Sequence, residues 1–78
     1  MSENEVRLRR WSPVADPAVL VAVRCVGLLH RADRVAVVRV NEDLVVLRAD
    51  HTPTAMLADQ VAELLRAGYG RGWRVEDG

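Results

Sequence analysis

The clearest pattern in the chain is a pair of valine-rich runs, 34–40 and 44–49, separated by the polar tripeptide Asn41-Glu42-Asp43. β-Branched residues favour strands, and Asn and Asp tolerate the backbone angles of tight turns. The pattern therefore predicts a β-hairpin with Glu42 and Asp43 at its tip. In this register one face is wholly apolar and contains Val38, Val40, Val45 and Leu47. The other face mixes apolar residues with arginine: Val35, Val37, Arg39, Leu44, Val46 and Arg48.

Residues 18–31 show the three- and four-residue spacing of an amphipathic helix. One side is apolar, with Val19, Ala22, Val23, Val26 and Leu29, whereas the other gathers Arg24, Gly27, His30 and Arg31. Asp16 and Pro17 predict the helix start, because an Asp side chain accepts hydrogen bonds from free helix amides and proline suits the first helical position. The many β-branched valines leave a strand as the alternative.

A second helix is predicted after Thr52-Pro53, with Thr52 as its cap and Gly68 as its end. Its apolar side contains Leu57, Val61, Leu64 and Leu65. Its polar side contains Asp59, Gln60, Glu63 and Arg66. The separation of the two sides makes this the best-defined element, and Leu57, Val61 and Leu65 are expected to be buried against the hairpin.

The ends of the chain show weaker signals. Residues 6–11 alternate enough for a short edge strand, and residues 73–75 form either a last strand or a tail that packs Trp73 on the core. The glycine-rich stretch 69–72, between the second helix and residues 73–75, predicts a flexible connection. Residues 1–4 and 76–78 are expected to fray.

These elements predict one α+β domain over residues 1–78, because a chain of this length holds a single core. The order is β-α-β-β-α-β, with the first and last strands the least certain. We expect a small two-layer sandwich in which both helices cover the Val38, Val40, Val45 and Leu47 face of an antiparallel sheet centred on the hairpin. Without a disulfide or a metal, so small a core is marginally stable unless a partner helps.

Composition narrows the setting of the protein. Eleven basic and eleven acidic residues balance, every basic residue is Arg, and Lys, Ile and Phe are absent, which indicates a GC-rich genome such as that of an actinobacterium or one of its phages. A single cysteine, Cys25, fits the reducing cytoplasm better than an oxidising compartment. The acidic start is unlike a signal peptide, and the apolar stretch 18–29 is too short to cross a membrane. We expect a cytoplasmic protein with no membrane partner.

No catalytic, cofactor-binding or metal-binding site is predicted. The potential metal ligands lack a recognised spacing, since Cys25 and His30 do not share a helical side, and Cys25 is expected to be a small buried apolar residue. Asp50-His51-Thr52 contains an acid, a base and a hydroxyl, but consecutive side chains point apart, so we expect His51→Ala to leave function intact. The stretch 68–72 follows a helix, whereas phosphate loops precede one.

Two functions remain. The first is a non-enzymatic protein–protein interaction module, self-associating or docking on a larger protein, that uses the arginine-containing hairpin face of Val35, Val37, Arg39, Leu44, Val46 and Arg48. The alternative is a small nucleic-acid-binding or regulatory protein. It would use a terminal patch of Arg7, Arg9, Arg10, Trp11, Arg71, Trp73 and Arg74, formed if the two ends lie side by side. Zero net charge makes this alternative the weaker one.

Overall fold

Six elements follow one another in the computed structural model, which describes residues 5–29, 33–50 and 52–76. They are β1 (Glu5–Arg10), α1 (Ala18–Leu28), β2 (Asp33–Val40), β3 (Leu44–Asp50), α2 (Thr54–Arg66) and β4 (Trp73–Val75). The order confirms the predicted β-α-β-β-α-β chain, which is that of the ferredoxin-like, or split βαβ, motif. This motif serves many unrelated functions and therefore assigns none.

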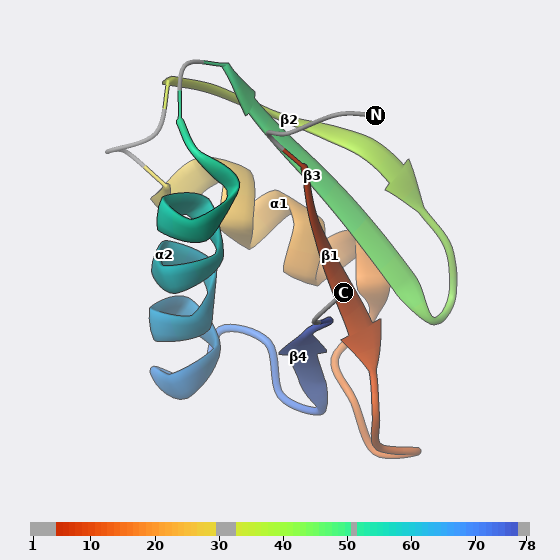
Figure 1. Ribbon diagram of the computed structural model, residues 1–78. Helices are drawn as coiled ribbons and strands as arrows, with labels where there is room; N and C mark the ends of the chain where they lie inside the picture. The colour runs from red at the N-terminus through yellow and green to blue at the C-terminus, as the bar shows by residue number, and fades with distance from the viewer. Residues whose placement is uncertain (1–4, 30–32, 51, 77–78) are drawn as a thin grey trace.

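The strands form one antiparallel sheet in the order β2-β3-β1-β4, and both helices cover the same face of it (Figure 1). The predicted two-layer α+β architecture is thus confirmed. β1 is not the edge strand that the sequence suggested, because β3 pairs with one side of it and β4 with the other. Val6 and Leu8 of β1 are consequently buried under the helices. The expected frayed residues 1–4, 77 and 78 lie outside the described residues, while Glu76 is held by donation of its amide to the Arg7 carbonyl.

The hairpin has the predicted tip but not the predicted register along its whole length. Asn41 and Leu44 exchange backbone hydrogen bonds across Glu42 and Asp43, and Val40 pairs with Val45 as expected. A register shift between Val37 and Arg39 then places Val37, not Val38, opposite Leu47. Because directly opposite residues share a face, this one-residue bulge moves Val37 to the helix-covered side.

α1 is rotated relative to the prediction. Its buried side contains Ala18, Val21, Ala22 and Cys25, followed by Leu29, whereas Val19, Val23 and Val26 are exposed. The predicted apolar side was therefore largely wrong. Apolar residues surround most of this helix, so spacing alone could not select the inner side. The small residues Ala18, Ala22 and Cys25 let the helix lie close to the sheet, and this favours the observed rotation.

α2 follows the prediction closely. Leu57 and Val61 are fully buried, while Leu64 and Leu65 pack partly buried against the same core. The helix ends in a Schellman motif, in which the Gly68 and Tyr69 amides donate to the carbonyls of Leu65 and Leu64, both at 3.1 Å. Gly68 has φ +96°, the left-handed conformation that this motif requires.

The predicted side-chain caps Asp16 and Thr52 are both wrong. Each would cap a helix that begins at the following proline, but the helices begin one residue later, at Ala18 and Thr54. Pro17 and Pro53 occupy the N-cap positions, in extended conformation and with no side-chain cap bond. The buried Thr52 instead donates its hydroxyl to the Asp50 carbonyl at 3.4 Å. His51, and with it the prediction for His51→Ala, lies outside the described residues.

Candidate functional site: an apolar helix surface

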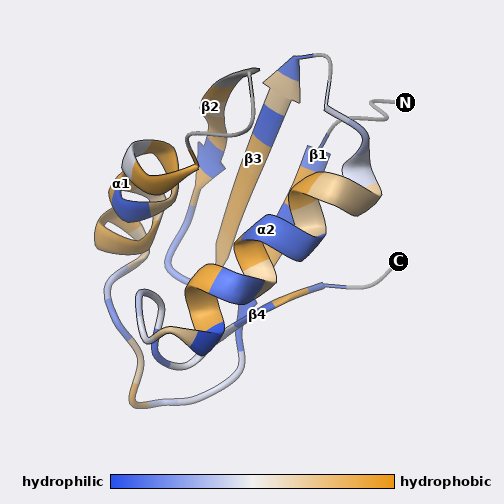
Figure 2. Cartoon of the chain, turned by 90° about the vertical axis from the view of Figure 1, so that its left-hand side faces the viewer, coloured by the Kyte–Doolittle hydropathy of each residue, from blue (hydrophilic) through white to orange (hydrophobic). Residues whose placement is uncertain are grey.

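The outer side of α1 exposes several large apolar side chains next to one another. Val19 and Val23 are 65% and 63% exposed, and Val26 and Leu20 are 41% and 38% exposed. We call these four residues, with the exposed Gly27 between them, the α1 surface. Figure 2 shows the contrast with α2: α1 is orange over most of its visible surface, whereas α2 alternates orange and blue. The exposed Val37 and Val38 lie on β2, the strand that α1 contacts most.

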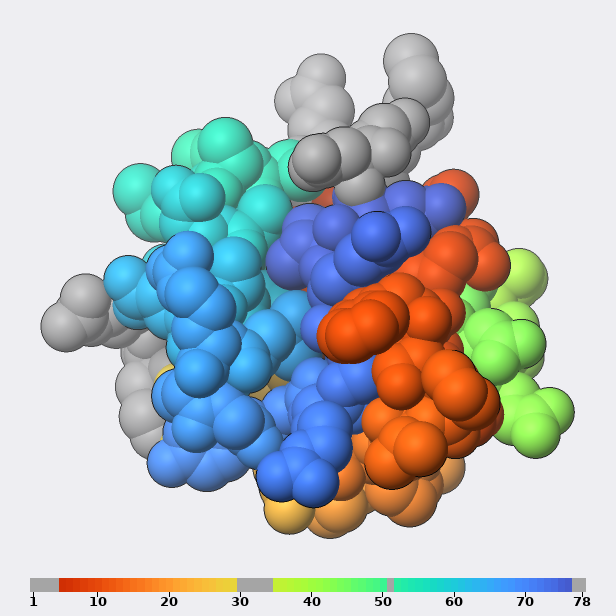
Figure 3. Space-filling view, turned by 90° about the horizontal axis from the view of Figure 1, so that it is seen from below, coloured from red at the N-terminus to blue at the C-terminus, as the bar shows by residue number. Residues whose placement is uncertain are grey.

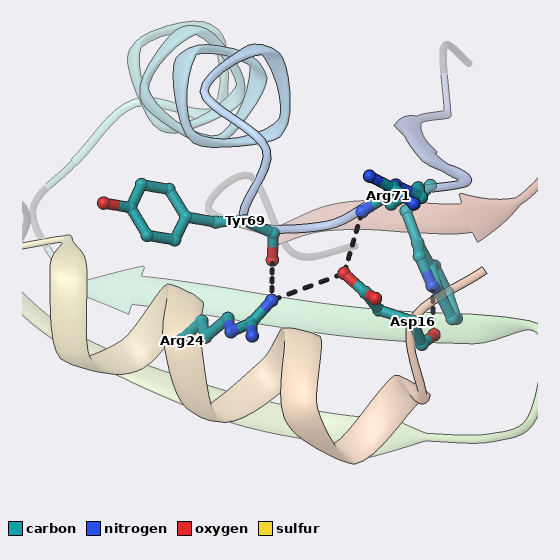
Figure 4. A network of polar contacts seen from close by, with 5 residues as sticks. Asp16, Arg24, Tyr69 and Arg71 are labelled. Carbon is teal, nitrogen blue, oxygen red and sulfur yellow. Dashed lines mark hydrogen bonds and ion pairs between the residues drawn. The ribbon is translucent and has the colours of Figure 1, made fainter.

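The only charged side chain within α1 lies at the edge of the α1 surface. Arg24 borders this surface and is engaged by two acceptors, the Asp16 carboxylate and the Tyr69 carbonyl, each 3.3 Å from its Nη1 atom (Figure 4). Successive residues of a helix are about 100° apart around its axis. At this angle an unbroken apolar arc is formed by Val26, Val19, Val23, Gly27 and Leu20, and Arg24 comes next to Leu20 at its end. The α1 surface thus contains no ionisable group.

The hairpin residues predicted as an interface do not share one face. Leu44, Val46, Arg39 and Arg48 lie on the open face of the sheet, away from the helices, whereas Val35 packs against the core on the helix side and Val37 pairs with Leu47 there. Val46 is only 6% exposed although no helix covers it. Arg7 and Arg39 sit directly opposite Val46 on its two neighbouring strands, and arginine stems cover apolar surface well. The open face is therefore lined by arginine instead of by exposed valine.

The two ends of the chain do lie side by side, as the terminal patch requires. Arg9 pairs with Arg74 and Arg10 with Trp73 in the β1–β4 ladder, and the red-orange β1 and the dark blue β4 lie in contact in Figure 3. Trp73 is nevertheless only 4% exposed, and its Nε1 donates to the Asp16 carbonyl at 2.8 Å. It cannot stack on a base. Trp11, in contrast, is 62% exposed.

The arginines of the terminal patch and the open face are divided between local bonds and solvent. Arg9 pairs with Glu76 at 3.1 Å, and Arg48 pairs with Glu5 at 2.7 Å. Arg10 donates to the carbonyls of Ser12 and Pro13, which fixes the loop after β1. Among the described residues, Arg7, Arg39 and Arg74 have no ion-pair partner and remain exposed on the open face.

Asp16 organises a polar network that the sequence did not reveal. Its Oδ2 accepts from the Arg71 amide at 3.0 Å as well as from Arg24, and its backbone amide donates to the Arg71 carbonyl (Figure 4). Together with the Trp73 indole bond, these contacts hold the stretch 69–72 against the start of α1. The predicted flexible connection is therefore bonded and partly buried, with Gly70 and Gly72 both buried.

Cys25 is buried in the core on the inner side of α1, as expected. Burial raises the pKa of its thiol from 9.0 to about 11, because the thiolate is poorly solvated there. Within the described ranges no three His, Cys, Asp or Glu side chains gather to hold a metal ion. Neither helix in those ranges is long and apolar enough to cross a membrane.

No protein-family model, curated protein or solved structure matches the chain. The surfaces described above therefore carry the functional proposal by themselves.

Proposed function

We propose that this domain is a non-enzymatic protein–protein interaction module that binds through the α1 surface. The observation that carries the proposal is the exposure of Val19, Leu20, Val23 and Val26 on one helix side without a charged residue among them. Contiguous apolar surface beyond a few hundred Å² commonly marks an interaction site on a soluble protein. The leading function is thus the one predicted from sequence, but its binding surface moves from the hairpin to α1.

The size of the α1 surface supports binding. Its exposed apolar area is on the order of 400 Å², within the range of about 300–600 Å² of the largest apolar patch on a monomer, which is often functional. Covering it would contribute roughly 10 kcal/mol at about 25 cal/mol per Å², before the entropic cost of association. That cost is estimated at about 4–15 kcal/mol, so contacts at the rim must add to the α1 contribution. The partner therefore has to match the surface over its full length.

Site-specific photo-crosslinking tests the proposal. A benzophenone amino acid is introduced at Val23 in the centre of the α1 surface, and as a matched control at Glu63 on the exposed side of α2. In cells that express the chain, irradiation should give a discrete protein adduct from position 23 and none from position 63. Equal labelling from both positions, or none from either, would refute binding through α1.

A second candidate function is binding of single-stranded nucleic acid on the open face. It is supported by the β1–β4 pairing, which places Arg9 opposite Arg74, beside Arg7 on the same face. The burial of Trp73 and the Arg9–Glu76 pair weigh against it, since one stacking ring is removed and one cation is neutralised. This function predicts that a fluorescent oligonucleotide binds with an affinity that falls steeply as salt rises, because bound phosphates release counterions. Arg74→Gln should then weaken binding while Arg66→Gln on α2 should not, and an affinity insensitive to both salt and Arg74→Gln would exclude it.

A further inference from the structure

We propose that the occupant of the α1 surface is a second copy of this chain, with the two α1 helices packed antiparallel about a two-fold axis at Val23. This inference rests on the proposed function and names its partner. Closed two-fold dimers are the commonest protein oligomers, and their interfaces use the same patch on both subunits. The patch must then be complementary to itself.

The α1 surface has that self-complementarity. Val23 is the middle residue of the 11-residue helix and also lies near the middle of its exposed apolar arc, so a two-fold axis there brings Val23 against its own copy. The same operation places Val19, the most exposed large apolar residue of the helix, opposite Gly27, and Leu20 opposite Val26. A Cβ built on Gly27 would meet nothing within 4 Å, which leaves space for the Val19 side chain of the other copy.

The area is consistent with a small dimer. Two α1 surfaces bury roughly 800 Å² of apolar area, and a stable interface needs about 1,000 Å² in total, a deficit that contacts along the neighbouring strand can supply. Val37 of β2, which is exposed on the helix-covered side of the sheet, is an apolar residue that can contribute. Within the described part of α1 and its ends, no charge on the α1 surface opposes the approach, and Arg24 is engaged by Asp16 and the Tyr69 carbonyl.

Edge-to-edge pairing of two β2 strands is the competing way to join two copies. β2 is an edge strand, but its ladder with β3 contains two register shifts, between Asp33 and Ala36 and between Val37 and Arg39. Bulges of this kind disturb the row of free amides and carbonyls that another strand would need. The helix side of the molecule is therefore the better surface for self-association.

Sedimentation velocity with matched variants tests the dimer. The purified wild-type chain should sediment as a dimer at micromolar concentration, and Val23→Asp should raise the dimer dissociation constant by at least roughly 100-fold, because two unpaired carboxylates would meet at the axis. Met56→Asp is the control, since Met56 is an exposed apolar residue on α2 and its change should leave the dimer intact. Circular dichroism verifies that both variants fold.

A disulfide trap tests the arrangement. In Val23→Cys the two new thiols lie across the axis and should form an intermolecular disulfide, giving up two protons and two electrons to dioxygen, whereas Met56→Cys should not. The native Cys25 is buried and stays out of the exchange. A wild-type chain that remains monomeric at millimolar concentration would overturn the dimer, and a dimer that the Val23→Cys variant fails to trap would overturn the α1 pairing. If the benzophenone at Val23 meanwhile captures a different protein, the proposed function stands, and only the assignment of a second copy as the partner is refuted.

Discussion

Replacing Gly72 with alanine should destabilise the fold through two separable effects. Gly72 has φ +82°, and an L-residue in the left-handed region costs about 1–2 kcal/mol. A Cβ at this position would also lie 2.5 Å from the Ala15 Cβ and 2.8 Å from the Val14 carbonyl oxygen. One of these contacts is with the backbone, so the chain itself must shift, which adds about 1–3 kcal/mol. Gly72→Ala should therefore cost about 2–5 kcal/mol of unfolding free energy, the sum of the two effects.

Two other glycines in the same chain serve as controls, one with the conformational effect alone and one with neither effect. Gly68 has φ +96° but an added Cβ would meet nothing within 4 Å, so Gly68→Ala should cost only the conformational part, about 1–2 kcal/mol. Gly27 lies in α1 with nothing within 4 Å of an added Cβ, and Gly27→Ala should stabilise the monomer by about 0.5–1 kcal/mol through helix propensity. From the most to the least stable, the expected order is Gly27→Ala, wild type, Gly68→Ala and Gly72→Ala.

Urea denaturation followed by circular dichroism measures this series. The protein concentration should be low enough that the chain does not associate, so that each free energy refers to the monomer. Equal slopes of free energy against urea would show that the variants unfold from comparable states. If Gly72→Ala is no less stable than Gly68→Ala, the close approach of residue 72 to residues 14 and 15 is refuted.

Three further predictions concern the core, the polar network and pH. Leu57→Ala should lower the free energy of unfolding by about 2–5 kcal/mol, measured by heat or urea, because Leu57 is fully buried. Truncating the exposed Met56 to alanine should change it by no more than about 0.5 kcal/mol. Equal effects would mean that the inner side of α2 is misassigned. Asp16→Ala should cost about 1–2 kcal/mol and increase hydrogen exchange at the Arg71 amide, which loses its acceptor; unchanged exchange would contradict the network. Between pH 9.0 and about 11 the unfolded chain loses the Cys25 proton while the folded chain keeps it, so stability should fall as pH rises through this window, and Cys25→Ala should remove that part of the decline.

The hairpin tip and α2 could be predicted because local sequence determines them. Asn41-Glu42-Asp43 is a strong turn signal, and the apolar and polar sides of α2 are cleanly separated. α1 gave no such contrast, since Val19, Val21, Ala22 and Val23 are all apolar and nothing local distinguishes the inner side from the outer. Only packing against the sheet decides the rotation of α1, and the α1 surface was consequently missed.

The remaining errors arise from features without a local signal. A one-residue bulge near Val38 reverses the face assigned to Val35 and Val37, and no residue in β2 marks its position. Asp16 resembles a helix cap, but its carboxylate bonds to Arg71, which is 55 positions away along the chain. Composition and spacing describe neighbours in sequence, so contacts of this range become visible only when the fold is known.

The position of β1 inside the sheet has a consequence for synthesis. β1 leaves the ribosome before the other elements of this domain, yet it pairs only with β3 and β4, and β4 is formed by residues 73–75. Leu8 therefore has no neighbour on the β4 side until residues 73–75 are released. Because contacts between distant residues form late, the apolar side of β1, Val6 and Leu8, stays incompletely covered in the nascent chain until β4 has emerged. The sheet around β1 is therefore completed only when β4 joins it.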